Sequence, residues 1–129
     1  MTRQGGGEGE AGFTALVIED EPLIALDTEE MLRDLGASEV RIVDEFGAAQ
    51  AELDDCRFGV VLFDLDLGGV STAALARAYL DLGCNAIVVS GADDALADFE
   101  GQNVRTLSKP VTAVALRGAL SETGIPLAR

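Results

Sequence analysis

The chain has 129 residues, 48% of them hydrophobic, and its 23 acidic and 9 basic residues give a formal net charge of −14. This length suits one domain that buries a core without support from disulfides or a metal. The positive mean hydropathy excludes a disordered chain, and the apolar runs are too short to span a membrane. The acidic balance argues against DNA or RNA as a partner, because binding phosphates needs a basic surface.

The two ends of the chain are predicted to lie outside the folded domain. The first 12 residues are rich in glycine, which predicts a flexible tail over 1–12, one domain over 13–122 and a short tail over 123–129. The start of the chain lacks the basic and apolar regions of a signal peptide, which predicts a cytoplasmic protein. Cys56 and Cys84 are predicted to be small buried hydrophobic residues without a redox role, although both precede strands that would be neighbours in the sheet.

Short apolar runs alternate along the domain with longer segments of helical periodicity. In chain order, the predicted strands are 14–19, 39–43, 59–63, 86–90 and 103–107. Three of these runs are apolar throughout, which is typical of parallel strands covered on both faces. The alternation of strands and helical segments predicts an α/β fold, a (βα)5 unit with an open, doubly wound parallel sheet and right-handed crossovers.

Each predicted helix carries apolar residues at helical spacing. The first begins at Pro22, which suits a first helical turn, and ends at Gly36. Ser71 is the predicted cap of the third helix, and the fourth, about 92–100, is short. The predicted buried stripes are Ile24, Thr28, Met31 and Leu35 in the first helix, Phe46, Ala49 and Leu53 in the second, Leu75, Tyr79 and Leu82 in the third, and Ala113, Leu116 and Leu120 in the fifth.

Polar and charged side chains follow four of the predicted strands at the point where each strand ends. They are Glu19, Asp20 and Glu21 after the first strand, Asp64 and Asp66 after the third, Ser90 and Gly91 after the fourth, and Ser108 and Lys109 after the fifth. Ligands of open α/β sheets bind beyond the carboxyl ends of the strands, where the strand order reverses. We therefore expect these residues to share one rim of the sheet.

The chemistry of this rim points to a cation and a phosphoryl group. Crowded carboxylates cannot all stay ionised without a cation, and the chain has no histidine. Oxygen ligands alone favour Mg²⁺, with Mn²⁺ or Ca²⁺ as alternatives. A metal, the chain's one lysine, Lys109, and a hydroxyl together form a clamp for a phosphoryl group. Because aspartate can act as a covalent acceptor, the sequence predicts phosphoryl transfer to an aspartate.

Four segments together resemble the receiver domains of two-component response regulators, of the single-domain type. The segments are Leu16 to Pro22 (LVIEDEP), Val61 to Asp66 (VLFDLD), Val88 to Gly91 (VVSG) and Ser108 to Pro110 (SKP). The resemblance spans about 13–121, nearly all of the predicted domain. It implies a flavodoxin-like sheet with strand order 2-1-3-4-5.

The resemblance also implies partners and a role for each acidic residue. Asp64 would accept a phosphoryl group from a phosphohistidine on a sensor histidine kinase or a histidine phosphotransfer protein. Asp20 would bind Mg²⁺ directly and Glu19 mainly through water, while the backbone carbonyl of Asp66 would complete the metal shell. Such a protein acts as a phosphoacceptor rather than as an enzyme.

Two further residues would hold the phosphoryl group itself. The resemblance implies that Ser90 hydrogen-bonds one phosphoryl oxygen and that Lys109 forms an ion pair with another. It also implies a cis peptide bond between Lys109 and Pro110, which would direct the lysine into the site. The alternatives are a helix cap for Ser90 and a surface residue before a turn for Lys109, and the combination of motifs favours the phosphoryl role for both.

The chain departs from the pattern of these receivers at three places. Thr106 stands where an aromatic switch residue is common, so the usual switch built from Ser90 and an aromatic ring is not expected in its ordinary form. The loop after Asp64 reads Leu67-Gly68-Gly69 instead of containing a Met-Pro pair, which predicts greater mobility. Val111 follows Pro110 where phenylalanine is usual.

Three functions remain as alternatives at this point. The first is a receiver that signals to an unknown protein target by phosphorylation-dependent contact, or that acts as a phosphate sink or shuttle. The second is a pseudo-receiver that binds a partner constitutively, which the missing aromatic at Thr106 favours. The third is a phosphatase like the haloacid dehalogenases, which also use an aspartyl phosphate; its motif, however, would lie on the first strand and not the third.

Overall fold

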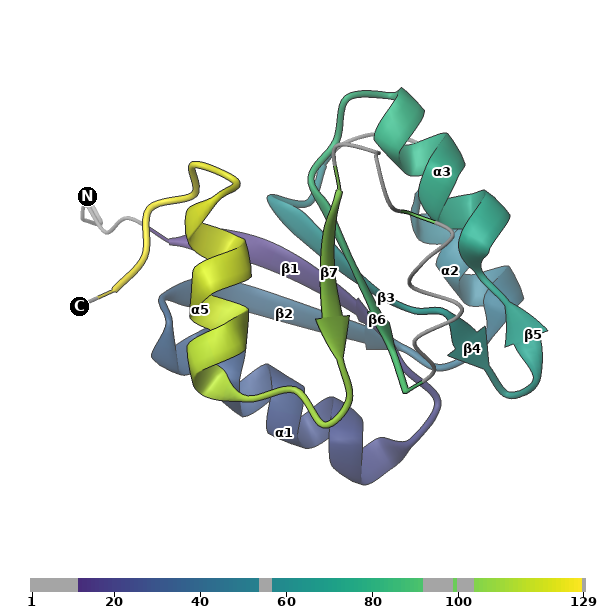
Figure 1. The fold of residues 1–129 in the computed structure, drawn as a ribbon, viewed down its shortest axis with the longest axis horizontal. Coiled ribbons are helices and arrows are strands. Elements are labelled where there is room, and N and C mark those ends of the chain that lie inside the picture. The colour runs from purple at the N-terminus through teal and green to yellow at the C-terminus, as the bar shows by residue number, and fades with distance from the viewer. Residues whose placement is uncertain (1–11, 54–56, 92–98, 100–103, 129) are drawn as a thin grey trace.

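A computed structural model describes residues 12–53, 57–91, 99 and 104–128. Its main sheet has five strands in the order β2-β1-β3-β6-β7 (Figure 1). The strands are β1 (Phe13–Ile18), β2 (Ala37–Val43), β3 (Val60–Asp64), β6 (Ala86–Ser90) and β7 (Arg105–Ser108). Each pair of neighbours is parallel. This confirms the predicted doubly wound sheet, since the order is 2-1-3-4-5 when its strands are counted along the chain.

Within the described part of the chain, four helices cover the two faces of this sheet. They are α1 (Pro22–Asp34), α2 (Phe46–Glu52), α3 (Ala73–Asp81) and α5 (Ala113–Ser121). Figure 1 shows α1 and α5 on one face and α2 and α3 on the other. The predicted fourth helix lies outside the described residues, apart from Phe99.

Alternation along the strands gives each face its own apolar core. Leu16 and Ile18 of β1 pack in the core beneath α2 and α3, whereas Ala15 and Val17 pack in the core beneath α1 and α5. Successive side chains of a strand point to opposite faces, so a strand covered on both sides is apolar throughout. This explains the uninterrupted apolar runs in the sequence.

The helices bury a slightly different stripe from the predicted one. In α1 the buried residues are Ala25, Thr28 and Leu32, and Ile24 is 38% exposed. In α3 the predicted Leu82 is exposed because it follows the last helical turn. In both helices an alanine is among the residues buried against the sheet, namely Ala25 and Ala76. The prediction placed only larger side chains at these buried positions.

A short hairpin follows β3 where a loop was expected. β4 (Asp66–Leu67) and β5 (Val70–Ser71) pair antiparallel. The two residues between them, Gly68 and Gly69, have φ of 61° and 88°. Positive φ at both central residues is typical of the type I′ turn that joins two strands tightly. The glycines therefore serve the turn geometry of a hairpin.

The carboxyl-terminal segment packs back on the domain. Ile125 and Leu127 contact the core beneath α1 and α5. The amide of Ala128 donates a hydrogen bond of 2.8 Å to the carbonyl of Leu35, and the guanidinium of Arg117 donates one of 2.8 Å to the carbonyl of Ala128. These contacts fasten the segment predicted as a tail to the end of α1 and to α5.

Cys84 is buried in the apolar core, as predicted, but it is disulfide-bonded. The sequence has one other cysteine, Cys56, which lies outside the described residues. The interpretation of Cys84 as only a small buried hydrophobic residue is therefore wrong, because its sulfur also takes part in a disulfide. The strands that the two cysteines precede in the sequence, β3 and β6, are neighbours in the sheet. Among the described residues, no helix is long and apolar enough to cross a membrane.

Candidate functional site

The carboxyl ends of β1, β3, β6 and β7 meet at one edge of the sheet. The pairing register brings Asp64 opposite Val89 and Ser90 opposite Ser108, so the residues that follow these strands are neighbours. A cavity of about 410 Å³ opens at this edge. It is lined by Asp20, Glu21, Asp64, Asp66, Gly68, Gly69, Ser90, Gly91 and Lys109. A separate cavity of about 420 Å³, near the end of α3, is lined by none of the predicted site residues. The structure thus brings the predicted site residues together, with Glu19 beside them.

Three carboxylates form the acidic centre of the site. Glu19, Asp20 and Asp64 each offer an oxygen, and these oxygens all lie within 4.8 Å of one another. Glu19 and Asp64 are 5% and 4% exposed. An all-oxygen set of this kind fits a hard divalent cation such as Mg²⁺, because a cation removes the repulsion between charges crowded away from water.

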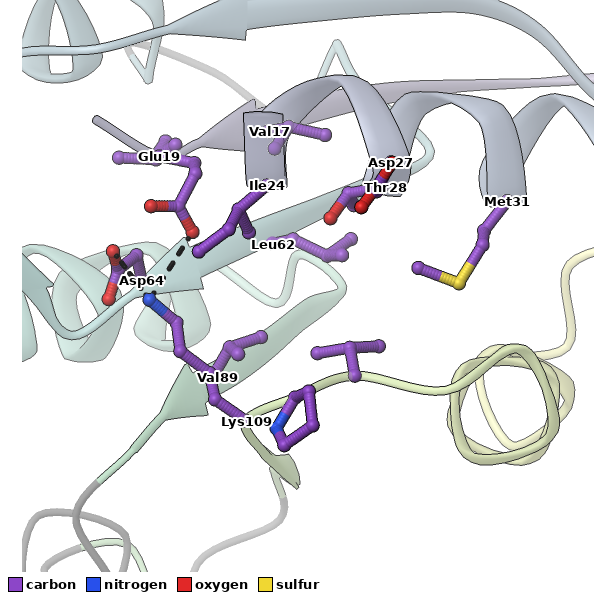
Figure 2. A pocket seen from close by; sticks show the side chains of 13 residues that line it. Val17, Glu19, Ile24, Asp27, Thr28, Met31, Leu62, Asp64, Val89 and Lys109 are labelled. Carbon is purple, nitrogen blue, oxygen red and sulfur yellow. Dashed lines mark hydrogen bonds and ion pairs between the residues drawn. The ribbon is translucent and has the colours of Figure 1, made fainter. Parts of the chain in front are cut away.

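Lys109, which directly follows β7, forms ion pairs with two carboxylates of the acidic centre. Its Nζ lies 3.1 Å from Oδ2 of Asp64 and 3.4 Å from Oε1 of Glu19, as the dashed lines in Figure 2 mark. Burial disfavours the charged ammonium, but the hydrogen bond and negative charge of Asp64, together with Glu19, outweigh burial and raise the pKa of Lys109. The lysine is therefore held as a cation between two buried carboxylates.

Backbone contacts hold Glu19 at the end of β1. Its amide donates a 3.0 Å hydrogen bond to the carbonyl of Val43 in β2, and its Oε2 accepts one of 3.2 Å from the amide of Glu21. Burial raises the pKa of the Glu19 carboxyl and the charge of Asp64 raises it further, while the Glu21 amide and Lys109 act in the opposite direction. A cation bound beside Glu19 would offset the burial and the repulsion from Asp64 that disfavour its charged form.

The raised pKa of Glu19 predicts a pH-dependent stability of the metal-free protein. A carboxyl with a higher pKa in the folded state stabilises the fold fully below its unfolded value, near 4.5, and this contribution is lost as pH rises through the folded pKa. We therefore expect Glu19→Gln to be more stable than wild type above that window, with the difference vanishing below it. Urea unfolding at several pH values measures this, and Glu30→Gln on the exposed side of α1 is the control. An equal response of both variants would contradict the prediction.

Asp66 uses its side chain to close the hairpin after β3. Its Oδ1 accepts a 2.9 Å hydrogen bond from the amide of Gly69, and its own amide donates one of 3.1 Å to Oδ1 of Asp64. The first contact ties the turn, and the second orients the Asp64 carboxylate. The side chain of Asp66 is therefore engaged in the hairpin, and a metal contact through its backbone carbonyl stays a prediction.

Thr72 is a site-positioning residue that the sequence reasoning missed. It is completely buried, its hydroxyl donates a 2.9 Å hydrogen bond to the backbone carbonyl of Asp64, and its amide donates one of 3.0 Å to the carbonyl of Leu65. The prediction of Ser71 as the cap of this helix is wrong, because Thr72 occupies the N-cap position of α3; Ser71 ends β5 and accepts a hydrogen bond from the amide of Ala73. A threonine at a helix start was the available signal, but the sequence does not show that its hydroxyl turns back to the preceding strand.

The last two strands carry the hydroxyl and the lysine. Ser90 is 5% exposed and lines the site cavity, and its backbone carbonyl accepts a 2.9 Å hydrogen bond from the amide of Lys109. The peptide bond between Lys109 and Pro110 is cis, as the resemblance implied. Thr106 lies on β7 opposite Val88 with its side chain exposed, so no ring stands at the switch position.

Comparison with known proteins rests on the structure. No family profile and no curated protein sequence matches the chain. A receiver domain (CheY-like) from Methylobacillus flagellatus matches with a TM-score of 0.75 and 23% identity over 88% of this chain and 99% of that one. One from Methanospirillum hungatei JF-1 gives 0.73 and 23% over 87% and 93%. The receiver domain of the response regulator PhyR from Erythrobacter litoralis gives 0.73 and 21% over 95% and 97%.

These structures and this chain share a common fold over most of their lengths. The similarity is one of architecture, because fewer than a quarter of the aligned residues are identical. It agrees with the resemblance seen at the strand ends. The chain therefore has the fold of the CheY-like receiver domains of response regulators.

Proposed function

We propose that this chain is a response-regulator receiver that accepts a phosphoryl group on Asp64 in the presence of Mg²⁺. The observation that supports this most strongly is the position of Asp64. Its carboxylate is buried at the end of β3, within 4.8 Å of two further carboxylate ligands, and one of its oxygens lies 3.1 Å from an ammonium. A cation and a phosphoryl group would together balance these charges.

The reaction is a displacement at phosphorus. A P–N bond of a phosphohistidine, or a P–O bond of a small acyl phosphate, breaks while a P–O bond forms to a carboxylate oxygen of Asp64, and the leaving group keeps the electron pair. A bound Mg²⁺, held by Glu19, Asp20 and Asp64, would neutralise charge on the phosphoryl oxygens. Lys109 would move from the free carboxylate to a phosphoryl oxygen, and Ser90 would donate a hydrogen bond to another.

The phosphodonor is another molecule, because the chain contains no histidine. A sensor histidine kinase or a histidine phosphotransfer protein supplies the required phosphohistidine. Leu23 and Leu26, near the start of α1, are 78% and 56% exposed, and such an apolar surface suits contact with a protein. The chain would act in the cytoplasm as an acceptor and not as an enzyme, passing its signal by contact with a target protein or serving as a phosphate sink or shuttle.

The direct test is the intact mass of the protein after incubation with acetyl phosphate. With Mg²⁺ we expect one added phosphoryl group on wild type. We expect none when a chelator removes the metal and none on Asp64→Asn, because the nucleophilic oxygen is lost. Asp66→Asn is the matched control, since its side chain serves the hairpin turn and its backbone carbonyl remains.

Two results would decide against this function. An adduct of equal size on Asp64→Asn would place the phosphoryl group elsewhere. If wild type gives no adduct, binding of beryllofluoride with Mg²⁺, a phosphoryl mimic, is measured next. Failure of both would support the constitutive pseudo-receiver, the alternative that the exposed Thr106 at the switch position favours.

A further inference from the structure

A second cavity lies beside the acidic centre, on the face of the sheet that α1 covers. Its volume is about 320 Å³, within the range of ~300–1,000 Å³ typical of sites that enclose small ligands. Figure 2 shows α1 on one side and the segment after Lys109 on the other. The lining residues are Val17, Ile18, Glu19, Ile24, Asp27, Thr28, Met31, Leu62, Asp64, Val89, Lys109, Pro110 and Val111.

The body of this cavity is apolar. Val17, Leu62 and Val89 of three adjacent strands lie between its two walls in Figure 2, and Ile24 and Met31 extend toward them from α1. Ile24 is 38% exposed although it belongs to a core-facing helix. Exposed apolar area next to a concave surface favours a ligand with an apolar body, because binding removes that area from water.

Val111 keeps the far wall open. It is a partly buried residue of the core beneath α1 and α5, and it stands where the resemblance to receivers led us to expect phenylalanine. Val111 lines the cavity, and a valine fills less of that space than a phenylalanine would.

The ionisable groups of the lining favour a cation. Three carboxylates face one ammonium, and that ammonium is already shared by Glu19 and Asp64. The side chain of Asp27 forms no hydrogen bond or ion pair within the described part of the chain. Its carboxylate lies on α1 beside Thr28, away from Lys109 in Figure 2. An apolar cavity thus has an unpaired negative charge at its edge.

We propose that this cavity binds a small amphipathic organic cation, with an apolar body between α1 and Val111 and an ammonium group at Asp27. The cavity shares Glu19, Asp64 and Lys109 with the acidic centre, but the proposed contacts are made by Asp27, the apolar residues of α1 and Val111, and binding does not require a phosphoryl group or Mg²⁺. A failure to bind the cation would therefore leave the proposed phosphoryl transfer to Asp64 standing, and a failure of phosphoryl transfer would leave the cation site standing.

The probe for this site is 4-butylbenzylamine, added to the full chain without metal and followed by two-dimensional NMR. We expect saturable shifts at Ile24, Met31 and Val111. Val111→Phe fills the cavity and is expected to raise the Kd at least tenfold, or about 1.4 kcal/mol. Val114→Phe is the matched control, because Val114 is 84% exposed on α5 and lies outside the lining; it should leave the Kd unchanged.

The charge is tested with an uncharged analogue, 4-butylbenzyl alcohol. Asp27→Asn should weaken binding of the amine several-fold and leave the alcohol unaffected, whereas Asp34→Asn at the end of α1 should affect neither. Asp27→Asn leaves the core intact, so the proposal can still be tested if Val111→Phe does not fold. Three results would each overturn the proposal: no binding by wild type in the millimolar range, equal Kd values for amine and alcohol, or shifts confined to residues outside the lining.

Discussion

Replacing Lys109 with methionine is expected to lower the free energy of unfolding of the metal-free protein by about 3 kcal/mol at pH 7. The variant leaves two carboxylates, 5% and 4% exposed, without the ammonium that contacts both. Removing one partner of a buried ion pair costs ~3–5 kcal/mol. We take the lower end because the lysine side chain is 24% exposed.

The pH dependence of this difference identifies its cause. The pKa of Lys109 is raised above the ordinary lysine value of 10.5, so the lysine's contribution to stability is fully present below pH 10.5 and is lost as pH rises through the folded pKa. Wild type and Lys109→Met should therefore converge in urea unfolding at high pH. Addition of Mg²⁺ should restore part of the loss at pH 7, because the metal replaces the missing positive charge.

A double variant provides the control for Lys109. In Lys109→Met with Asp64→Asn, one of the stranded charges is gone, and we expect most of the destabilisation to disappear. A coupling energy near zero in this cycle would show that the lysine acts through packing of its alkyl chain instead of through its charge.

Replacing Thr72 with valine is expected to lower the free energy of unfolding by about 2 kcal/mol. Valine has nearly the same shape, but it cannot donate the 2.9 Å hydrogen bond to the carbonyl of Asp64. Leaving a buried acceptor without its donor costs ~1–3 kcal/mol. The same change frees the end of β3, so we expect a slower transfer from acetyl phosphate to Asp64 as well.

Thr72→Ser separates these effects from packing. Serine keeps the hydroxyl and loses a methyl group, so it should retain most of the transfer rate while losing some stability. If serine and valine at this position slow transfer equally, the hydrogen bond to Asp64 does not position the acceptor. Mass spectrometry over a time course and urea unfolding provide the two readouts.

The sequence alone determined the sheet and the edge that carries the chemistry. Parallel strands covered on both faces are apolar throughout, as in β3 and β6, and this local pattern is independent of the rest of the fold. The predicted strand ends placed Asp64, Ser90 and Lys109 together, because parallel strands end at the same edge of a sheet. The prediction of oxygen ligands for a cation depended only on which residue types stand at these ends.

Only the tertiary structure decided which side chains turn toward one another. The hydroxyl of Thr72 reaches back to the strand before its helix, and Asp66 closes a hairpin whose glycines were expected to form a mobile loop. Ile24 was predicted to lie in the core and instead lines the cavity beside the site. Sequence periodicity predicts that a segment is helical and which of its residues share a face. The rotation of the helix about its own axis decides which face packs on the sheet, and this rotation depends on side chains from distant segments of the chain.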